Sequence, residues 1–213
     1  MEVFRIIIHS WTSSFRYPRI ISKDQLTMPV PGFSTILGMI SSCKGEYFKL
    51  DDSKIGYTFT YESINKELVK VLSVNKTKSN IGIGSNSIMK EFLYDNYLHL
   101  YTTNKNIVNY FRMPEYALTM GRRSDIASIL DITSFETHEI DTLSGINGTV
   151  VDFKDKNIPA NIHSLSKHFT SDFHRKCISP KPYYILDHKS QAHTFKAKGI
   201  HDPELKRDIY WQE

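Results

Sequence analysis

The stretch VFRIIIHS, residues 3–10, decides the fold of this chain because its apolar positions follow the period of a β-strand. Phe4, Ile6 and Ile8 fall on one side of an extended chain, whereas a mixed set that includes Arg5 falls on the other side. The stretch therefore predicts a strand with one dry face and one mixed face.

Outward from this strand, the apolar spacing predicts a helix over residues 34–44, with Ser34 as N-cap and Gly45 as C-cap. Two strands follow, then a short helix from the Asn104 cap through Phe111, and then one or two further strands; the strands cover residues 55–61, 96–103 and 116–133. This order is the ferredoxin-like arrangement, so we predict an α+β fold. Its sheet leaves one face open, and the RNA-recognition module uses such a face to stack bases.

Two segments interrupt this order. Three prolines before Gly32 predict a long loop over residues 11–31, and loops of that length are usually functional or disordered. Residues 62–92 combine five lysines with the run SNIGIGSN, which predicts a projecting hairpin. We therefore divide the chain into a ferredoxin-like (RRM-like) domain, residues 1–133, and a small β-rich C-terminal region, residues 134–213, with strands around 137–153 and 183–196 and a loop-rich segment between them.

Composition excludes several classes of protein. The chain has 213 residues, of which 40% are hydrophobic and 23% charged, so it is a folded globular protein and not a disordered one. Its apolar runs are too short to cross a bilayer, and no signal peptide is visible, so we expect a cytoplasmic protein without a membrane partner. Only Cys43 and Cys177 are present, which excludes cysteine-based zinc sites.

Charge is unevenly distributed along the chain. Residues 53–124 carry ten basic against five acidic side chains, and residues 125–152 carry six acidic side chains and no Lys or Arg. A basic surface suits a polyanion, and an acidic surface suits a protein neighbour or plain solvation. Solvated faces with accidental clustering are the alternative explanation.

Two loops carry candidate RNA contacts. In the first, aromatic rings that could stack on bases alternate with arginines that could hold phosphates, although these rings could equally pack onto the domain. In the second, a glycine, two guanidiniums and a hydroxyl suit a phosphate, although an arginine could instead pair with Asp125. The candidates are Trp11, Phe15, Arg16, Tyr17 and Arg19 in the first loop and Gly121, Arg122, Arg123 and Ser124 in the second.

Three further groups of side chains have both a functional and a structural explanation. Lys76 and Lys78 near the hairpin tip could reach a phosphate backbone or could simply be solvated. Three side chains share one face of a strand and could stack bases, although core positions are the better explanation; they are Tyr97, His99 and Tyr101. The spacing of three histidines matches no zinc signature, and no nucleotide-binding or hydrolase motif is present, so we expect no metal, no cofactor and no catalytic residue; the histidines are His163, His168 and His174.

Three blocks of sequence, in this order, resemble a known family. The first is the N-terminal strand followed by SFRYP (14–18) and MPVPGFSTILGMI (28–40), the second is KEFLYDNYLHLY (90–101) and the third is LTMGRRSDIA (118–127). They resemble the CRISPR-associated subunit of the RAMP superfamily that caps the crRNA 5′ handle in type I Cascade, the fifth numbered Cas protein family, and look most like its type I-B relatives. The resemblance covers roughly residues 1–130.

The resemblance implies a role for the separate candidates. In that family the ferredoxin-like domain grips the 5′ handle of the crRNA, and a thumb-like hairpin presses on the junction of handle and spacer. The two loops would stand at the handle, and residues 62–92 would be the thumb. Implied partners are the crRNA, the Cascade large and backbone subunits, and target DNA through the assembled complex, in antiviral defence. We expect no catalysis; the alternative is a metal-independent endoribonuclease that processes precursor crRNA with a Tyr, Lys and His set, as in type I-C relatives.

Overall fold

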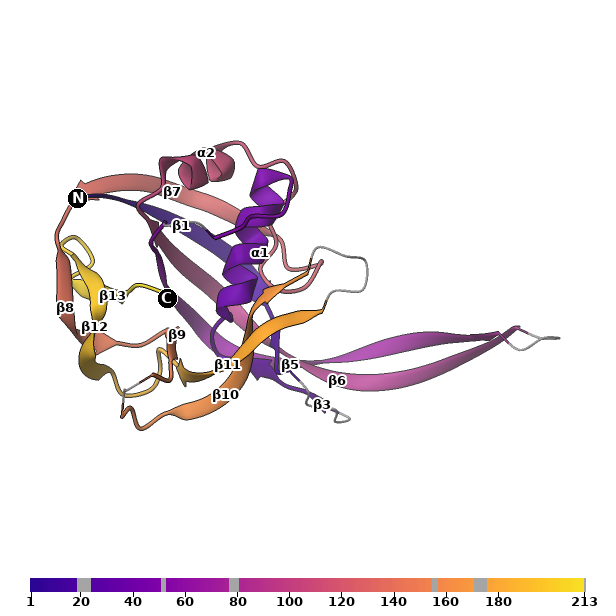
Figure 1. Cartoon of the computed structure of the whole chain (residues 1–213). Helices are drawn as coiled ribbons and strands as arrows, with labels where there is room; N and C mark the ends of the chain where they lie inside the picture. Colours follow the sequence, from indigo (N-terminus) through magenta and orange to yellow (C-terminus); the bar gives the residue numbers. More distant parts are fainter. Residues whose placement is uncertain (19–23, 51–52, 77–80, 155–156, 171–175, 213) are drawn as a thin grey trace.

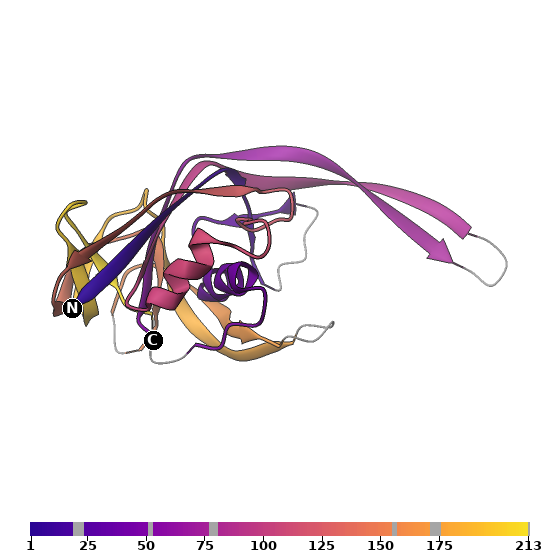
Figure 2. The same cartoon turned by 90° about the horizontal axis from the view of Figure 1, so that it is seen from above.

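One mixed sheet carries the two helices of the described residues on one face (Figures 1 and 2). The computed structural model describes residues 1–18, 24–50, 53–76, 81–154, 157–170 and 176–212. The expected order of strands and helices over residues 1–133 is present, and the α+β fold class is confirmed. The elements are β1 (Glu2–Ser13), α1 (Phe33–Lys44), β5 (Ile55–Lys76), β6 (Ile81–Thr102), α2 (Lys105–Arg112) and β7 (Ala127–Glu136).

The alternation predicted in β1 positions this strand at the centre of the sheet. β1 pairs antiparallel with β6 on one side and with β7 on the other, and β5 pairs antiparallel with β6. Phe4, Ile6 and Ile8 lie in the main hydrophobic core, which also takes in the buried side of both helices, including Ile36 and Phe111. Burying such large apolar side chains between sheet and helices is the main favourable contribution to this fold.

The helix ends follow local capping chemistry. Asn104 caps α2 as predicted, because its side-chain oxygen accepts a hydrogen bond from the Asn106 amide at 2.8 Å. Gly45 ends α1 in the left-handed conformation, with φ 83°, as predicted. The predicted N-cap Ser34 is wrong by two residues, because the chain enters α1 at Gly32, whose carbonyl oxygen accepts from the Thr35 amide at 2.8 Å.

The predicted long loop over residues 11–31 is largely replaced by strands among the described residues. β1 continues through Trp11 to Ser13, and β2 (Phe15–Arg16) pairs with β4 (Thr27–Met28). β3 (Asp24–Gln25) runs parallel to β6. Phe15, Met28 and Val30 of this segment are core residues, so pairing the backbone keeps its polar groups satisfied as those side chains become buried.

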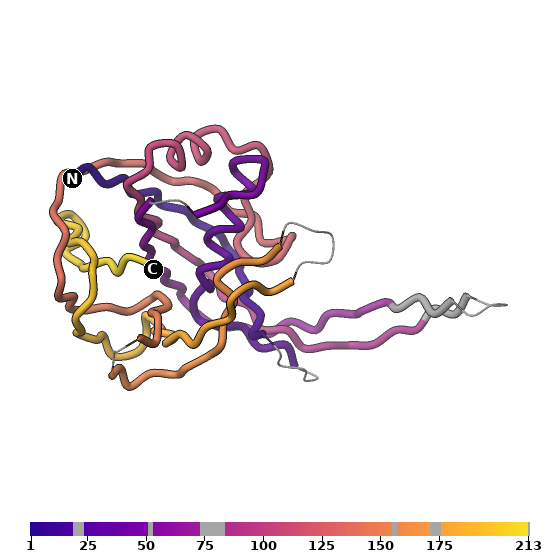
Figure 3. The backbone as a smooth tube through the Cα atoms, viewed as in Figure 1, coloured from indigo at the N-terminus to yellow at the C-terminus, as the bar shows by residue number. Residues whose placement is uncertain are grey.

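The hairpin predicted at residues 62–92 is formed by the far halves of β5 and β6, and is called the thumb below. The two strands leave the sheet together and project as a two-stranded ribbon (Figures 1 and 3). Their pairing runs from Ile55 with Thr102 at the sheet to Lys76 with Ile81 near the tip, with one break at Glu62 and Asp95. The thumb is therefore a direct extension of the central sheet.

The C-terminal region forms two small antiparallel sheets. One has the order β10-β11-β9, and the other β13-β12-β8. The strands are β8 (Glu139–Ile146), β9 (Thr149–Asp152), β10 (Asn161–Phe169), β11 (Cys177–Leu186), β12 (His193–Asp202) and β13 (Arg207–Tyr210). The segment expected to be loop-rich therefore contains β10 and most of β11. Pro180 and Pro182 fit in β11 because β9 pairs only with residues 183–186, so the prolines fall on an edge.

The main core crosses the expected boundary between residues 133 and 134. Leu165, Tyr183 and Ile185 belong to the same core cluster as β1 and α1, so the β10–β11 hairpin covers the helical side of the sheet. The division into two domains stays a prediction. No helix among the described residues is long and apolar enough to span a membrane.

The sheet face opposite the helices is covered over only half of its length. At one end Ile200, Ile209 and Trp211 pack on Val3 and Tyr101, which point away from the helices. Along β1 the outward-pointing side chains change from fully buried Val3 to His9, which is 12% exposed, and then to Trp11, which is 63% exposed. The half nearer the thumb is therefore open.

Candidate nucleic-acid interface

The two loops singled out from the sequence lie against each other at the base of the thumb. Gly121 has a φ of 107°, and a Cβ atom there would collide with the carbonyl oxygen of Ser14. Glycine is therefore required both for the backbone conformation and for the close approach of the two loops. The Ser14 hydroxyl donates to the Glu91 carbonyl at 3.0 Å, which attaches the first loop to β6.

Two arginines of these loops present accessible guanidinium groups. Arg16 and Arg123 are both exposed, and neither forms an ion pair with any described residue. Ser124, beside Arg123, is also exposed. Each guanidinium offers five N–H donors in a fork that fits a phosphate, so these side chains are suited to hold a polyanion.

Arg122, in contrast, is a structural residue. Its Nε and Nη2 donate to the two carboxylate oxygens of Asp125 at 3.0 and 3.1 Å, and its Nη1 is paired with Glu67 of the thumb. Burial opposes its charge, but the hydrogen bonds from Asp125 and Glu67 outweigh burial and raise the pKa of Arg122. The predicted phosphate contact is corrected at this position, because the guanidinium already joins the loop to the thumb.

The aromatic residues of the first loop are also largely committed to packing. Phe15 is only 3% exposed and packs edge-on against Phe59 at 5.3 Å, so the predicted stacking on a base is corrected at this position. Tyr17 is half-buried, 4.9 Å from the His163 ring, and lines a groove of about 700 Å³ at the thumb base. Burial, then the charges of Glu91 and Asp187, raise the pKa of Tyr17. The predicted contacts Arg19 and Lys78 lie outside the described residues, and of Lys76 only the backbone, in β5, is described.

The three β6 residues that share the face of Trp11 differ in exposure, which increases from Tyr101 through His99 to Tyr97. Tyr101 is fully buried under the C-terminal strands, and its hydroxyl donates to Asp202 at 2.8 Å. His99 is half-buried, and burial, followed by the charges of Arg207 and Arg5, lowers its pKa to about 4. Tyr97, where a core position was expected, is 37% exposed.

Sequence reasoning missed Tyr94 and His9, which join Trp11 and Tyr97 in one group. The Trp11 ring lies 6.1 Å from Tyr94 and 4.9 Å from His9, and His9 lies 4.8 Å from Tyr97. Asp95, with φ 52°, marks a bend in β6 where the alternation of the strand reverses, so Tyr94 turns outward. The Asp95 carboxylate holds the His9 Nε2 at 2.8 Å. The positive φ is invisible to pattern analysis, which explains the omission.

A Tyr, His and Lys set occurs in a different place, near the groove. The Tyr61 ring lies 4.5 Å from His188, and the Lys189 Nζ lies 5.0 Å from the ring centroid. Tyr61 is only 4% exposed, and its hydroxyl donates to Asp187 at 2.9 Å. Burial and the negative charge of Asp187 raise the pKa of Tyr61, which opposes its use as a general base.

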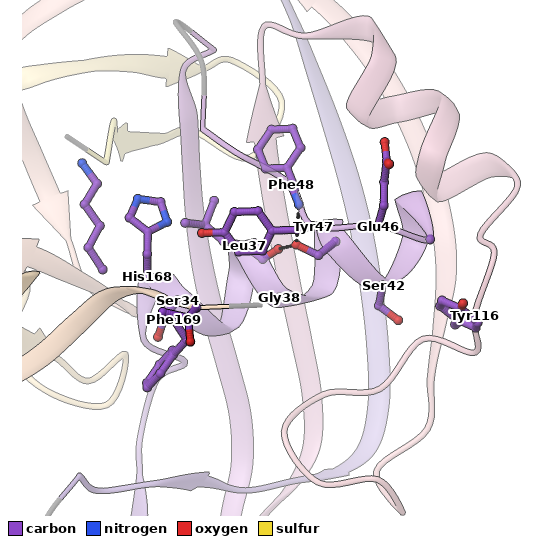
Figure 4. Close-up of a pocket in the computed structure, with 14 residues that line it drawn as sticks. Ser34, Leu37, Gly38, Ser42, Glu46, Tyr47, Phe48, Tyr116, His168 and Phe169 are labelled. Atoms are coloured by element: carbon purple, nitrogen blue, oxygen red, sulfur yellow. Dashed lines mark hydrogen bonds between the residues drawn. The ribbon is translucent and has the colours of Figure 1, made fainter. Parts of the chain in front are cut away.

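A separate cleft of about 370 Å³ lies between α1 and the end of β10 (Figure 4). Tyr47 and Phe48, from the segment after α1, line it together with His168 and Phe169 of β10. Burial and the neighbouring Lys167 lower the pKa of His168. The cleft shares no residue with the two loops. His174 lies outside the described residues, and among those described no three His, Cys, Asp or Glu side chains are grouped as a metal site.

Known structures are similar to this chain in fold, without a match in sequence. Neither a protein-family model nor a curated protein sequence matches the chain. A chain of a CRISPR RNA-guided surveillance complex is 11% identical, with a TM-score of 0.52 over 99% of this chain and 89% of that chain. A chain of the type III-B Cmr-beta complex bound to cognate target RNA and AMPPnP is 10% identical, with a TM-score of 0.56 over 86% of this chain and 84% of that chain. A second structure of Cmr-beta bound to cognate target RNA has a similar chain, 13% identical, with a TM-score of 0.51 over 98% and 86% of the two chains.

Proposed function

We propose that this chain is a non-catalytic RNA-binding subunit of a type I CRISPR surveillance complex, where it holds the 5′ handle of the crRNA in antiviral defence. The observation that carries the proposal is the meeting of two loops, from opposite ends of the first 130 residues, at the base of the thumb. Each loop brings one accessible guanidinium, Arg16 or Arg123, to this place. Guanidinium groups form charge-assisted hydrogen bonds with phosphates, so two of them at one place suit the backbone of an RNA.

The arrangement of the sheet supports a ferredoxin-like assignment for the central domain. Its four long strands have the order β5-β6-β1-β7, so the first strand lies between the third and the fourth in chain order. Both helices lie on one face, as a βαββαβ unit requires. The fold likeness to chains of CRISPR surveillance complexes agrees with this assignment.

We further propose that the large and backbone subunits of the complex contact this chain, and that target DNA reaches it only through the complex. The acidic stretch 125–152 contributes less to such contacts than its composition suggests. Glu139 pairs with Lys54 and Lys198, and Glu136 pairs with the N-terminal amine. These acids already pair with cations of the same chain, which leaves Asp131 and Asp141 as the exposed acids of the stretch that form no ion pair with a described residue.

The test is the RNA content of the purified complex. The double variant Arg16→Ala with Arg123→Ala is expected to lose guide RNA as salt is raised, while the chain stays assembled. Each phosphate contact contributes about 0.7 to the slope of log affinity against log salt for a single strand, so losing two contacts lowers the slope by about 1.4. The matched control, Arg112→Ala with Lys196→Ala, removes two exposed cations from α2 and β12 and is expected to change neither quantity. Equal RNA retention by both double variants contradicts the proposal.

The endoribonuclease alternative rests on the Tyr61, His188 and Lys189 set. It requires the purified chain to cut a cognate repeat RNA in the presence of EDTA. We expect no specific product on a gel. A product that His188→Ala abolishes would replace a binding role with a catalytic one.

A further inference from the structure

We propose that the open half of the sheet is a stacking platform for unpaired bases of single-stranded RNA, made by His9, Trp11, Tyr94 and Tyr97. The proposal rests on the proposed function and adds the mode by which bases, as distinct from phosphates, are held. Trp11, Tyr94 and Tyr97 are 63%, 38% and 37% exposed, and their ring contacts, directly or through His9, join them into one surface. Aromatic rings grouped on an exposed sheet face are what single-stranded nucleic acid uses for stacking.

The platform is left uncovered by the architecture, which covers the rest of the same face. Val3 and Tyr101 are sealed by the C-terminal strands, and this cover ends before His9. Burying Trp11 would remove a large apolar surface from water, and contiguous exposed apolar surfaces usually mark interaction sites. The rings are therefore accessible to a ligand, and burying them on binding would contribute favourable free energy.

Cations lie at both ends of the platform, which favours a polyanion. At the thumb end the cation is the exposed Arg123, which forms no ion pair with a described residue. It follows Arg122, whose guanidinium is neutralised by Asp125 and Glu67 and lies 6.0 Å from the centroid of Phe92, two residues from Tyr94 on the same strand. At the other end Arg207 lies close enough to His99 to lower its pKa, and its Nη1 lies 3.5 Å from the Thr58 hydroxyl. A chain of bases with phosphates at these ends fits both features.

The platform is continuous with the site at the thumb base. Ile126 directly precedes Ala127, the register partner of Ser10, so the loop that carries Arg123 ends beside Trp11. The Thr12 hydroxyl donates to Asp125 at 2.9 Å, and the Ser10 hydroxyl to the Ile126 carbonyl at 2.9 Å. These bonds fix the loop against the strand that carries Trp11. An RNA held by Arg123 would therefore lie next to the rings.

The fluorescence of the full-length chain provides a direct test. The chain has two tryptophans, and Trp211 is only 4% exposed, so a change on adding RNA reports mainly on Trp11. The probe is a single-stranded RNA about eight nucleotides long, within the range that such surfaces cover. We expect quenching on binding. Absence of quenching by an RNA whose binding depends on Arg16 and Arg123 overturns the platform and leaves the proposed function intact.

Substitutions distinguish stacking from apolar contact. Trp11→Leu and Tyr97→Leu keep apolar surface without a ring and are expected to weaken RNA binding by about 5- to 150-fold each, with an unchanged salt slope. Trp11→Phe keeps a ring and is expected to recover most of that loss. The matched control Tyr116→Leu changes an exposed ring outside the platform and is expected to bind like the wild type.

Other outcomes separate the platform from the function on which it rests. Binding by Trp11→Leu as tight as by the wild type, or release of a neighbouring subunit from the complex in that variant without loss of RNA affinity, overturns the platform in favour of a protein contact. Conversely, RNA binding with full quenching in the Arg16→Ala, Arg123→Ala variant, by a chain that never co-purifies with a CRISPR complex, overturns the proposed function and keeps the platform.

Discussion

Replacing Asp202 with alanine is expected to destabilise the chain more than a change at any surface acid. Asp202 ends β12, and its carboxylate is fully buried. It accepts hydrogen bonds from the Arg5 Nη1 of β1 at 2.9 Å and from the Tyr101 hydroxyl of β6 at 2.8 Å. The backbone amides of Glu204 and Leu205 also donate to it, at 3.0 and 3.1 Å. The group therefore attaches the C-terminal strands to the central sheet.

The magnitude follows from the charge that the substitution leaves behind. Arg5 is only 2% exposed, so in Asp202→Ala its guanidinium stays buried and loses its fully buried counter-ion. Breaking a buried pair from one side costs about 3–5 kcal/mol. Glu204 also pairs with Arg5 and is largely exposed, which places the expected loss at the lower end. A loss of about 3 kcal/mol lowers the Tm of a chain of this length by roughly 6–12 °C.

Urea unfolding followed by fluorescence measures this loss, because Trp211 belongs to the cluster that seals this end of the sheet. The control Asp141→Ala removes an exposed acid from β8 and is expected to stay within about 0.5 kcal/mol of the wild type. The pair Arg5→Met with Asp202→Leu removes both charges and is expected to be more stable than Asp202→Ala alone. A loss below about 1 kcal/mol for Asp202→Ala, or a double variant as unstable as the single one, would refute the reasoning.

Four further outcomes follow from single sites. Gly121→Ala is expected to destabilise the chain, as measured by thermal unfolding, because its φ of 107° and the Ser14 carbonyl leave no room for a Cβ atom. Asn104→Ala removes the α2 cap and is expected to cost about 1 kcal/mol in the same assay. Arg122→Ala is expected to cost about 1–3 kcal/mol in urea unfolding, because it leaves a buried carboxylate short of donors. The free energy of unfolding is expected to fall as pH drops from about 6.5 to about 4, because over this range His99 is protonated in the unfolded chain but not in the folded chain. The His99→Gln variant is expected to lose this part of the pH dependence of stability.

The backbone plan of the central domain could be predicted from the sequence because local rules decide it. Alternation marked the strands at residues 3–10, 55–61 and 96–103, and a side-chain cap marked the start of α2. β10 was not predicted, because its apolar pattern is weak and its partner strand β11 contains prolines. The prolines fit only because that part of β11 is a sheet edge. Its place in the core depends on α1, more than a hundred residues earlier.

The candidate site was predictable as loops but not as individual side chains. Gly121 and Arg123 lie where a phosphate contact is possible, whereas Arg122 of the same motif forms ion pairs with Asp125 and Glu67. The pairing with Asp125 is local and was weighed as an alternative. The pairing with Glu67 is not local, because it depends on the thumb leaving the sheet beside this loop. Phe15 lies in the core for a similar reason, since the ring that it packs against belongs to β5.

Tyr97, His99 and Tyr101 show why one face of one strand can carry several roles. The three are equivalent by alternation, and sequence alone could only weigh core against stacking for the set. The exposure of each residue depends on β12 and β13. These strands cover Tyr101, place Arg207 near His99 and end before Tyr97. The C-terminal strands thus set the border of the open platform. Substitutions on their side of His99 should change stability, and substitutions beyond it should change RNA binding at nearly constant stability, so the two properties can be altered separately along a single strand.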